Sequence, residues 1–325
     1  MSKVSVNLVT WNGERYVLDC LKALFNQTYK DYSLLIIDNF STDNTVEVIK
    51  EKYPHIKIVE HRENHGFAKA HNQAVHWTKS DYVLMLNQDI ILESRFIEKL
   101  ANFMDGHPQA GAVTGKLMSW QNKQKTNYID SAGLAIYKNH RIVDLGSGEM
   151  DNGQFDKDQE IFGVSGAAPM YRRQALEDVV ENGQFFDEDF WMYKEDIDLA
   201  YRLRWRGWQS WRMPKAIAFH DRSVSGPAAN LTDRQVASNR KQKPKFANFH
   251  SYRNHRYLLL KNVPKLNWRI RLYEIKKFLY ILFAEQGSLR AIKEIRHNKK
   301  KFLDKKKYIM DRKKVEFAEI EKWFV

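Results

Sequence analysis

Short apolar runs alternate with stretches of helical spacing along the first 90 residues of the chain. Strands buried on both faces are expected at 4–9, 34–37, 56–59 and 82–86. Apolar residues recur at helical spacing over 18–25, and further helices are expected after a cap at Ser41 or Thr42 and from 64 to about 78. These alternations, with short connections, predict a Rossmann-like α/β fold with a mainly parallel central sheet, rather than a barrel or a sandwich.

Polar side chains follow two of these strands directly. Asp38 comes after the second run, and Asn87, Gln88 and Asp89 come after the fourth. The carboxyl ends of parallel strands meet at one edge of a sheet, where ligands bind, and a carboxylate there can hold a hard divalent cation. The alternative for Asp89 is that it caps the helix expected to begin near Ser94.

Two common nucleotide-binding motifs are missing from the sequence. No Gly-x-Gly-x-x-Gly follows the first strand, and no phosphate loop ends in Lys-Ser or Lys-Thr. This argues against a dinucleotide dehydrogenase and against a phosphate-loop hydrolase. A nucleotide can still bind at this edge, with Asp38 or Asn39 at the base or ribose and a metal on Asp89 neutralising a diphosphate.

The middle of the chain is less regular. A strand is expected at 111–117, and a hairpin is expected to join 127–137 to 141–145. The polar stretch 146–160 predicts a loop over the site, and Trp120 either faces an acceptor or packs in the structure.

Two adjacent acids begin a later predicted helix. Leu199, Ala200 and Leu203 follow Asp196 at helical spacing, which places Asp196 on the buried face in the first turn. The helix dipole favours the ionised carboxylate there, and such a group can take the proton from an acceptor hydroxyl. The alternative is that Glu195 and Asp196 only stabilise the start of the helix.

A histidine ends a further apolar run. His220 follows the run 216–219, so it stands at another strand terminus. A lone histidine is more often structural than a ligand. On the residues alone, a structural role and a metal-binding role are both open for His220.

Composition narrows the class of protein. The 325 residues suffice for one large domain or two modest ones, and 13% aromatic residues argue against a disordered chain. The single Cys20 excludes an intramolecular disulfide and fits a reducing compartment. We expect no secretory signal at the N-terminus and no membrane-spanning segment. The net charge of +13 suggests an anionic partner: nucleic acid, acidic lipid or a phosphorylated substrate.

The basic residues gather toward the end of the chain, which predicts a domain at 1–230 and a basic helical extension at 231–325. Within 270–283, Leu272, Ile275 and Leu279 fall on one helical face among basic residues. Such a helix lies in a membrane interface, or packs as a solvated hairpin or a homo-oligomer contact. Nucleic acid is a weaker alternative because no recognised binding motif accompanies the charge.

In their order along the chain, these motifs resemble the inverting glycosyltransferases of family 2, which have the GT-A fold. The matching segments are Val-Thr-Trp-Asn-Gly (9–13), Gln-Thr-Tyr (27–29), Ile-Ile-Asp-Asn-Phe-Ser-Thr-Asp (36–43), Asn-His-Gly-Phe-Ala (64–68), Asn72, Leu-Asn-Gln-Asp (86–89), Val-Ser-Gly-Ala-Ala (164–168), Phe-Asp-Glu (186–188), Tyr-Lys-Glu-Asp-Ile-Asp (193–198), Arg202 and His220. They cover about the first 225 residues. The asparagine-rich forms at 38–39 and 87–89 look most like the rhamnosyltransferase branch. The family's usual Asp-x-Asp metal motif has Asn87 at its first position here, which leaves Asp89 and His220 to hold the metal.

The resemblance implies a metal-dependent enzyme that transfers a sugar, with inversion, from dTDP-rhamnose or a UDP-sugar. The acceptor would be a hydroxyl of a glycan or lipid-linked saccharide in cell-surface polysaccharide synthesis. Mg²⁺ or Mn²⁺ would bind Asp89 and His220, with Asp196 as the general base and Glu195 beside it. The implied nucleotide-sugar ligands are Val9, Thr10, Asn12, Asp38, Asn39, Asp43, Lys69, Asn72, Asn87 and Gln88.

The resemblance also implies a place in the cell. An enzyme of this type would be cytoplasmic and peripherally associated with the inner face of the cell membrane, with the anionic surface as a partner. Two other classes stay open. Asn87 suggests a non-catalytic nucleotide-sugar- or glycan-binding protein on a degenerate GT-A fold, and the basic extension suggests an RNA-binding protein.

Overall fold

The first four apolar runs form parallel strands, as the sequence predicts. They are β1 (Val4–Thr10), β2 (Tyr32–Asp38), β3 (Ile58–Glu60) and β4 (Tyr82–Asn87), in the order β4-β1-β2-β3. The register pairs Thr10 with Asp38 and Val9 with Asn87. The polar residues that end β1, β2 and β4 therefore lie at one edge of the sheet. The computed structural model describes residues 1–121, 124–221, 240 and 243–325.

Later strands extend this sheet with mixed directions. They are β5 (Ile90–Leu92), β6 (Ala110–Gln121), β7 (Gln124–Ser131), β10 (Gln159–Ile161), β11 (Met170–Arg172) and β12 (Gln209–His220). The strand β11 runs antiparallel between β4 and β6, whereas β12 lies parallel to β6. The end of β12 pairs with β5, which brings His220 opposite Ile90 and next to Asp89.

The predicted hairpin at 127–145 is only partly right. The strands β8 (Leu134–Ile136) and β9 (Ile142–Asp144) form a hairpin around the expected turn. Residues 124–131 belong instead to β7, which pairs with β6. Gly133 lies between β7 and β8 and has φ 110°, a backbone conformation that favours glycine. This conformation ends the extended run.

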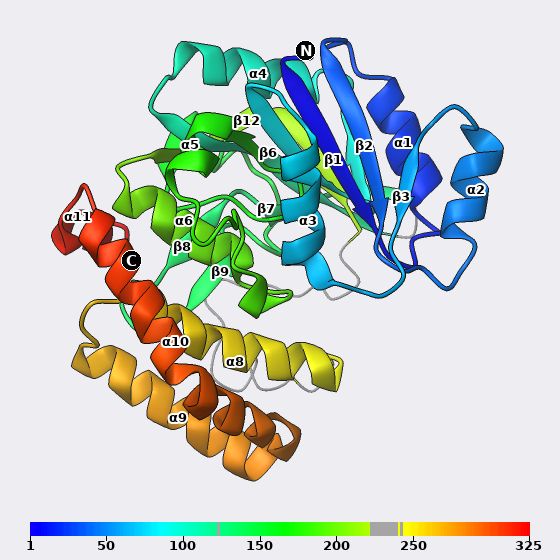
Figure 1. Cartoon of the computed structure of the whole chain (residues 1–325). Helices are drawn as coiled ribbons and strands as arrows, with labels where there is room; N and C mark the ends of the chain where they lie inside the picture. Colours follow the sequence, from blue (N-terminus) through cyan, green and yellow to red (C-terminus); the bar gives the residue numbers. More distant parts are fainter. Residues whose placement is uncertain (122–123, 222–239, 241–242) are drawn as a thin grey trace.

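Helices cover both faces of the sheet (Figure 1). They are α1 (Val17–Phe25), α2 (Thr45–Lys52), α3 (Gly66–Trp77), α4 (Phe96–Gly106), α5 (Arg173–Asp178), the short 3-10 helix η1 (Glu188–Phe190) and α6 (Glu195–Trp205). The cap expected at Ser41 or Thr42 is wrong, and the alternative role of Asp89 as a helix cap is excluded. The helix α2 begins at Thr45, whose amide donates to Asp43, while Ser41 donates to Asp38 instead. Asp89 is followed by β5 and caps no helix, since α4 begins only at Phe96.

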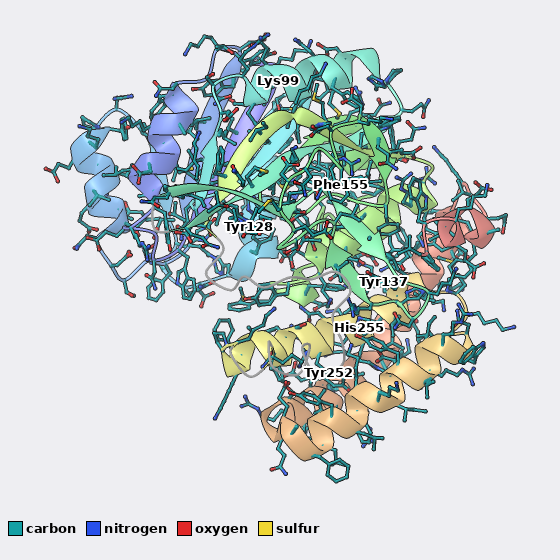
Figure 2. All side chains as sticks on the ribbon, turned by 180° about the vertical axis from the view of Figure 1, so that it is seen from behind. Lys99, Tyr128, Tyr137, Phe155, Tyr252 and His255 are labelled. Carbon is teal, nitrogen blue, oxygen red and sulfur yellow. The ribbon has the colours of Figure 1, made fainter. Side chains whose placement is uncertain are left out.

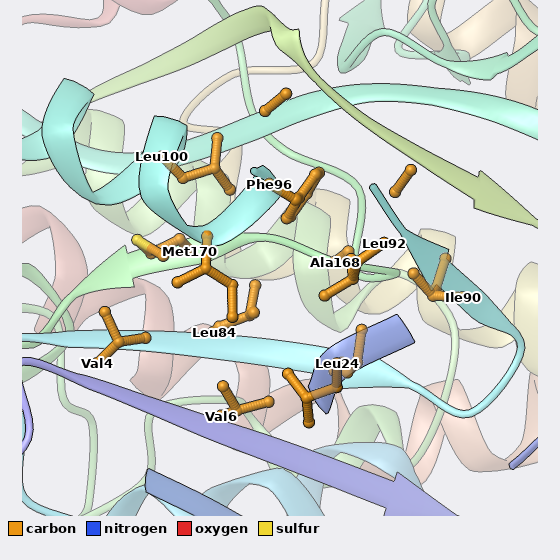
Figure 3. Packing of buried hydrophobic residues seen from close by; sticks show 14 of the residues in the cluster. Val4, Val6, Leu24, Leu84, Ile90, Leu92, Phe96, Leu100, Ala168 and Met170 are labelled. Carbon is orange, nitrogen blue, oxygen red and sulfur yellow. The ribbon is translucent and has the colours of Figure 1, made fainter. Parts of the chain in front are cut away.

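A continuous apolar core holds this edge of the sheet in place (Figure 3). Val6 and Leu84 from neighbouring strands pack with Leu24 of α1 and with Phe96 and Leu100 of α4, and none of the five has exposed surface. Each such side chain contributes roughly 1.5–3 kcal/mol of stability on burial. The strand ends that carry the polar residues are therefore rigidly supported.

The basic extension forms a small bundle of helices beside the sheet domain (Figure 1). It contains α8 (Lys245–Asn262), α9 (Trp268–Ala284), the short 3-10 helix η2 (Gln286–Leu289), α10 (Arg290–Arg312) and α11 (Phe317–Glu321). Tyr252 and His255, labelled in Figure 2, belong to α8; Tyr252 packs with Ile281 of α9, and His255 pairs with Glu274 of α9 at 2.8 Å. Within the described residues, none of the helices has the length and apolar content that crossing a membrane requires.

Buried ion pairs fasten this bundle to the sheet domain. The Lys261 ammonium group of α8 has no exposed surface and lies 2.7 Å from Asp187 and 3.1 Å from Asp198. Lys305 of α10 reaches Asp187 as well, at 2.6 Å. Removing one member of a buried ion pair is costly because it leaves the partner charge uncompensated. The predicted domain boundary at residue 230 lies outside the described residues.

Candidate active site

A cavity of about 220 Å³ opens at the carboxyl ends of β1 and β4. Its lining residues are Val9, Thr10, Trp11, Asn39, Asn64, Gly66, Phe67, Asn87, Gln88, Asp89, Trp191, Met192 and Phe246. Six of the predicted site residues are among them: Val9, Thr10, Asn39, Asn87, Gln88 and Asp89. The sequence reasoning did not single out Trp191 or Phe246, which come from the segment before α6 and from α8.

Asp38 does not line the cavity, and its neighbours hold its carboxylate. Its carboxylate accepts hydrogen bonds from the Thr10 hydroxyl at 2.9 Å, from the Ser41 hydroxyl at 2.6 Å and from the Ser41 amide at 2.8 Å. Only 3% of Asp38 is exposed. The carboxylate thus fixes the turn after β2, and its predicted contact with a nucleoside stays a prediction.

Asn39 holds the loop that leads into α3. Its side-chain oxygen accepts from the His65 amide at 3.0 Å, and its side-chain nitrogen donates to Asn64 at 3.0 Å and to the Gly66 carbonyl at 3.3 Å. The geometry gives Asn39 a clear positioning role at the cavity wall.

Gln88, which lines the cavity, and Asn12 hold the turn after β1. The Gln88 amide exchanges two hydrogen bonds of 2.9 Å with the backbone of Trp11. Asn12 has φ 48° and accepts from the Thr42 amide at 2.8 Å, which ties the turn after β1 to the turn after β2. Asp43 accepts from the Glu14 amide at 3.1 Å, so it links the same turns.

Two of the predicted ligands lie on α3, outside the residues that line the cavity. Asn72 is buried and exchanges two hydrogen bonds of 2.8 Å with the backbone of Phe186. Lys69 lies with its ammonium nitrogen 3.5 Å from His65 Nδ1. Asn72 therefore joins α3 to the segment before α6, and Lys69 is placed beside the loop that Asn39 holds.

Asp89 lines the cavity and His220 lies beside Asp89, while their shared role in metal binding stays a prediction. His220 Nε2 lies 3.5 Å from Asp89 Oδ1. On the other side of the ring, Nδ1 lies 2.8 Å from Oδ2 of Asp130, a buried residue of β7. Burial lowers the pKa of His220, but the charges of Asp89 and Asp130 outweigh it and raise that pKa to about 10.

The Asp89–His220 pair fits a divalent cation that takes the place of the proton on Nε2 of His220, since a histidine binds metal in its neutral form. Asp89 Oδ1 is buried with no hydrogen-bond partner, and the Asp130 contact leaves Nε2 of His220 facing it. A carboxylate on the far nitrogen is the usual means of orienting a metal-binding histidine. Nowhere in the described part of the chain do three or more His, Cys, Asp or Glu residues gather into a metal cluster. Two protein ligands suit Mg²⁺ or Mn²⁺ that also takes oxygens from a substrate phosphate. Arg222 and Ser223, near the end of β12, lie outside the described residues.

Asp196 stands in the first turn of α6, close to the cavity. Its Oδ2 accepts from the Gly166 amide at 3.1 Å, and its Oδ1 accepts from the Ile197 amide at 2.8 Å. A Cβ placed on Gly166 would lie 3.6 Å from both Asp196 and the cavity residue Phe67. Gly166 is therefore a neighbour of both the Asp196 carboxylate and the cavity residue Phe67, although neither Gly166 nor Asp196 lines the cavity itself.

Burial raises the pKa values of both adjacent acids. Burial and the charge of Asp144 raise the pKa of Asp196 to about 6, although the two amides oppose this. Burial and the charge of Asp196 raise the pKa of Glu195 to about 8. Because Glu195 and Asp196 are adjacent and the charge of Asp196 acts on Glu195, they lose their protons as a pair in two steps, and the pair can accept a proton once the first step is complete.

The backbone before α6 is strained. Trp191, Tyr193 and Lys194 have φ of 62°, 66° and 71°, in the left-handed region that side chains other than glycine rarely adopt. Such residues cost about 1–3 kcal/mol each and persist only where the surroundings hold them. Residues 191–194, here called the 191–194 loop, join the cavity wall at Trp191 to α6 at Glu195.

Comparison with solved structures defines the class of fold. The crystal structure of GalNAc-T7 with UDP, GalNAc and Mn²⁺ matches with a TM-score of 0.60, over 80% of this chain and 48% of that chain. At 12% sequence identity, this likeness concerns the fold alone. The predicted GT-A fold is confirmed.

The chain belongs to glycosyl transferase family 2, whose family model matches residues 5–180. Poly-beta-1,6-N-acetyl-D-glucosamine synthase of Staphylococcus epidermidis is 25% identical over 222 residues, which are 66% of this chain and 49% of that protein. The N-acetylglucosaminyl-diphospho-decaprenol L-rhamnosyltransferase of Mycobacterium tuberculosis is 26% identical over 258 residues, or 69% of this chain and 78% of that protein. The chain thus spans about half the length of the first of these relatives.

Proposed function

We propose that this protein is an inverting glycosyltransferase that moves a sugar from a nucleotide-sugar to a hydroxyl of a glycan or lipid-linked acceptor. The observation that carries the proposal is that two aspartates with different surroundings, Asp89 and Asp196, lie in and near one cavity. Asp89 lines the cavity and faces His220, and Asp196 accepts from the amide of Gly166, which neighbours the cavity residue Phe67. Asp89 and His220 suit a diphosphate with its metal, and Asp196 suits an attacking hydroxyl.

The chemistry is a single displacement. The ionised Asp196 takes the proton of the acceptor hydroxyl as its oxygen bonds to the anomeric carbon. The bond from that carbon to the diphosphate oxygen breaks at the opposite face, so the configuration inverts and a nucleoside diphosphate leaves. A divalent cation, when bound at Asp89 and His220, supplies positive charge to the leaving diphosphate. Glu195, with the higher pKa, acts beside the base and not as the base itself.

We further infer dTDP-rhamnose as the donor, with a UDP-sugar as the second candidate, and cell-surface polysaccharide synthesis as the process. The support is the Asp38-Asn39 and Asn87-Gln88-Asp89 sequence forms, together with one relative that is named as a rhamnosyltransferase. A screen of nucleotide-sugars for thermal stabilisation, with and without Mn²⁺, tests this choice. The expected result is metal-dependent stabilisation by dTDP-rhamnose, followed by release of dTDP when an acceptor is added. Stabilisation without turnover by any donor would instead indicate a binding protein.

We also propose that α9 attaches the protein peripherally to the inner face of the cell membrane. Six apolar side chains of this helix are at least 41% exposed: Trp268, Leu272, Ile275, Phe278, Leu279 and Phe283. The exposed Arg269 and Arg271 flank them, whereas the acidic Glu274 is buried against Arg256. An apolar stripe with a basic border is typical of helices that lie in an anionic membrane interface.

The membrane proposal predicts binding to anionic vesicles. The protein should sediment with phosphatidylcholine–phosphatidylglycerol vesicles at low salt and be partly released at high salt, because salt screens the attraction of each basic residue. The double variant Ile275→Glu/Leu279→Glu should lose this binding and keep its donor affinity. Leu303→Glu, at an exposed apolar position on α10, is the matched control. Failure of the wild type to sediment at low salt would overturn the proposal, as would a stable dimer that the double variant dissociates.

A further inference from the structure

The 191–194 loop receives hydrogen bonds from a single side chain of α8. The buried amide nitrogen of Asn254 lies 2.8 Å from each of three carbonyl oxygens, those of Phe190, Met192 and Tyr193. The carbonyl oxygen between them, that of Trp191, accepts from the Ala68 amide of α3 at 3.2 Å. Four consecutive carbonyl groups are thus held by donors from outside the loop.

The orientation of the Asn254 amide is itself fixed. Its side-chain oxygen accepts from Nε of Arg253 at 3.0 Å, which directs the nitrogen toward the loop. Arg253 in turn lies 2.9 Å from Glu294 of α10 and donates to the Phe190 carbonyl at 3.3 Å. A chain of contacts therefore runs from α10 through α8 to the strained backbone before α6.

The 191–194 loop connects the cavity, at Trp191, to the start of the helix that carries Asp196, at Lys194. At one end, the Trp191 indole lines the cavity and lies so close to Gly66 that a Cβ there would be 2.4 Å from the ring. The same indole stacks on His250 of α8, with ring centroids 5.0 Å apart. At the other end, Lys194 is the residue from which α6 starts, two positions before Asp196. A change of φ at Lys194 would turn the first helical turn and move the Asp196 carboxylate.

We propose that Asn254 is a positioning residue for glycosyl transfer: by holding the 191–194 loop, it sets the place of Asp196 and of the Trp191 wall. The inference rests on the proposed function and extends it, because it makes the helical extension a part of the active site. The left-handed residues Trp191, Tyr193 and Lys194 cost conformational energy, so they need outside contacts to persist. The Asn254 amide nitrogen shares its two N–H groups among the carbonyl oxygens of Phe190, Met192 and Tyr193, which lie within and beside this run.

Two substitutions separate this role from a general effect on folding. Asn254→Ala removes the donor, and Asn254→Asp keeps the shape but presents oxygens to the three carbonyl groups. The matched control is Asn298→Ala on α10. It removes a half-buried side-chain amide that donates to the hydroxyl of Tyr257 on α8 at 2.9 Å, within the same bundle. We expect kcat to fall about 10- to 100-fold in both Asn254 variants, since small displacements of reacting groups cost that much. The KM for the donor should change less than kcat does, because the metal site and the strand ends stay in place and only the Trp191 wall of the cavity shifts.

Hydrogen–deuterium exchange gives a second readout that does not need turnover. Amides of residues 190–198 should exchange faster in Asn254→Ala than in the wild type or in Asn298→Ala, with unchanged exchange in β1 and β4. Unchanged exchange at 190–198 would overturn the proposal. So would faster exchange with wild-type kcat, since the loop would then not control transfer. If the wild type transferred no sugar at all, the proposed function would fail, while the exchange result would still decide whether Asn254 holds the loop.

Discussion

Replacing Asp196 with asparagine should lower the rate of sugar transfer by about 100-fold or more. The substitution keeps the size of the side chain, and its one remaining oxygen can still accept from the Gly166 amide. It gives up the second acceptor, which faces the Ile197 amide, and removes the group that accepts the hydroxyl proton. Affinity for the nucleotide-sugar should persist, because the proposed function gives Asp196 a role toward the acceptor and none in holding the donor. The measurement is kcat and donor affinity in the same preparation, with Asp304→Asn, at an exposed position on α10, as the control.

The same assignment predicts a pH dependence. A general base works only when ionised, and the pKa of Asp196 is raised to about 6 by burial and by Asp144. The wild-type rate should therefore fall as the pH drops through about 6, and the residual rate of Asp196→Asn should lack this decline. A variant with near-wild-type turnover, or with the same acid limb, would show that another group is the base.

Replacing Asp89 with alanine should weaken binding of the nucleoside diphosphate in saturating Mn²⁺ by about 100-fold or more. Charge stabilisation of phosphoryl oxygens by a metal is worth several kcal/mol, and Asp89 supplies the carboxylate of the proposed metal pair. The fold should survive, since Asp89 lies between β4 and β5 and outside the apolar core.

Isothermal titration calorimetry with and without EDTA measures this effect. In EDTA, the wild type and Asp89→Ala should bind the diphosphate equally weakly. Asp130→Asn should weaken metal affinity by about 10- to 100-fold, because Asp130 acts on the metal only through His220. Its diphosphate affinity in Mn²⁺ should therefore lie between those of the wild type and Asp89→Ala. Equal diphosphate affinity of Asp89→Ala and the wild type in saturating Mn²⁺ would remove Asp89 from the metal site.

The sequence predicted the edge where the site forms, because strand ends can be read from local patterns. The apolar runs before Asp38 and Asp89 place both at the carboxyl ends of parallel strands, and that edge is where the cavity lies. His220 was likewise placed by the run that precedes it, and β12 brings it beside Asp89.

What the sequence could not show are contacts between distant elements. Asp130 lies 90 residues before His220, in a strand whose pairing with β6 was not predicted. Asn254 lies in the basic extension, and nothing local distinguishes its amide from a surface one. For Asn39, Gln88 and Asn72, the sequence also gives no sign of the backbone contacts that their side-chain amides make. Each amide holds a neighbouring backbone segment, and its binding to the nucleotide-sugar stays a prediction.

The central claim is a single displacement with Asp196 as the base, and the configuration of the product tests it most directly. Proton NMR during the reaction of a nucleotide-sugar of known anomeric configuration with its acceptor shows the configuration first formed. The account predicts a product of opposite configuration and no covalent sugar–protein species in the mass spectrum. A product that retains the donor's configuration would contradict it.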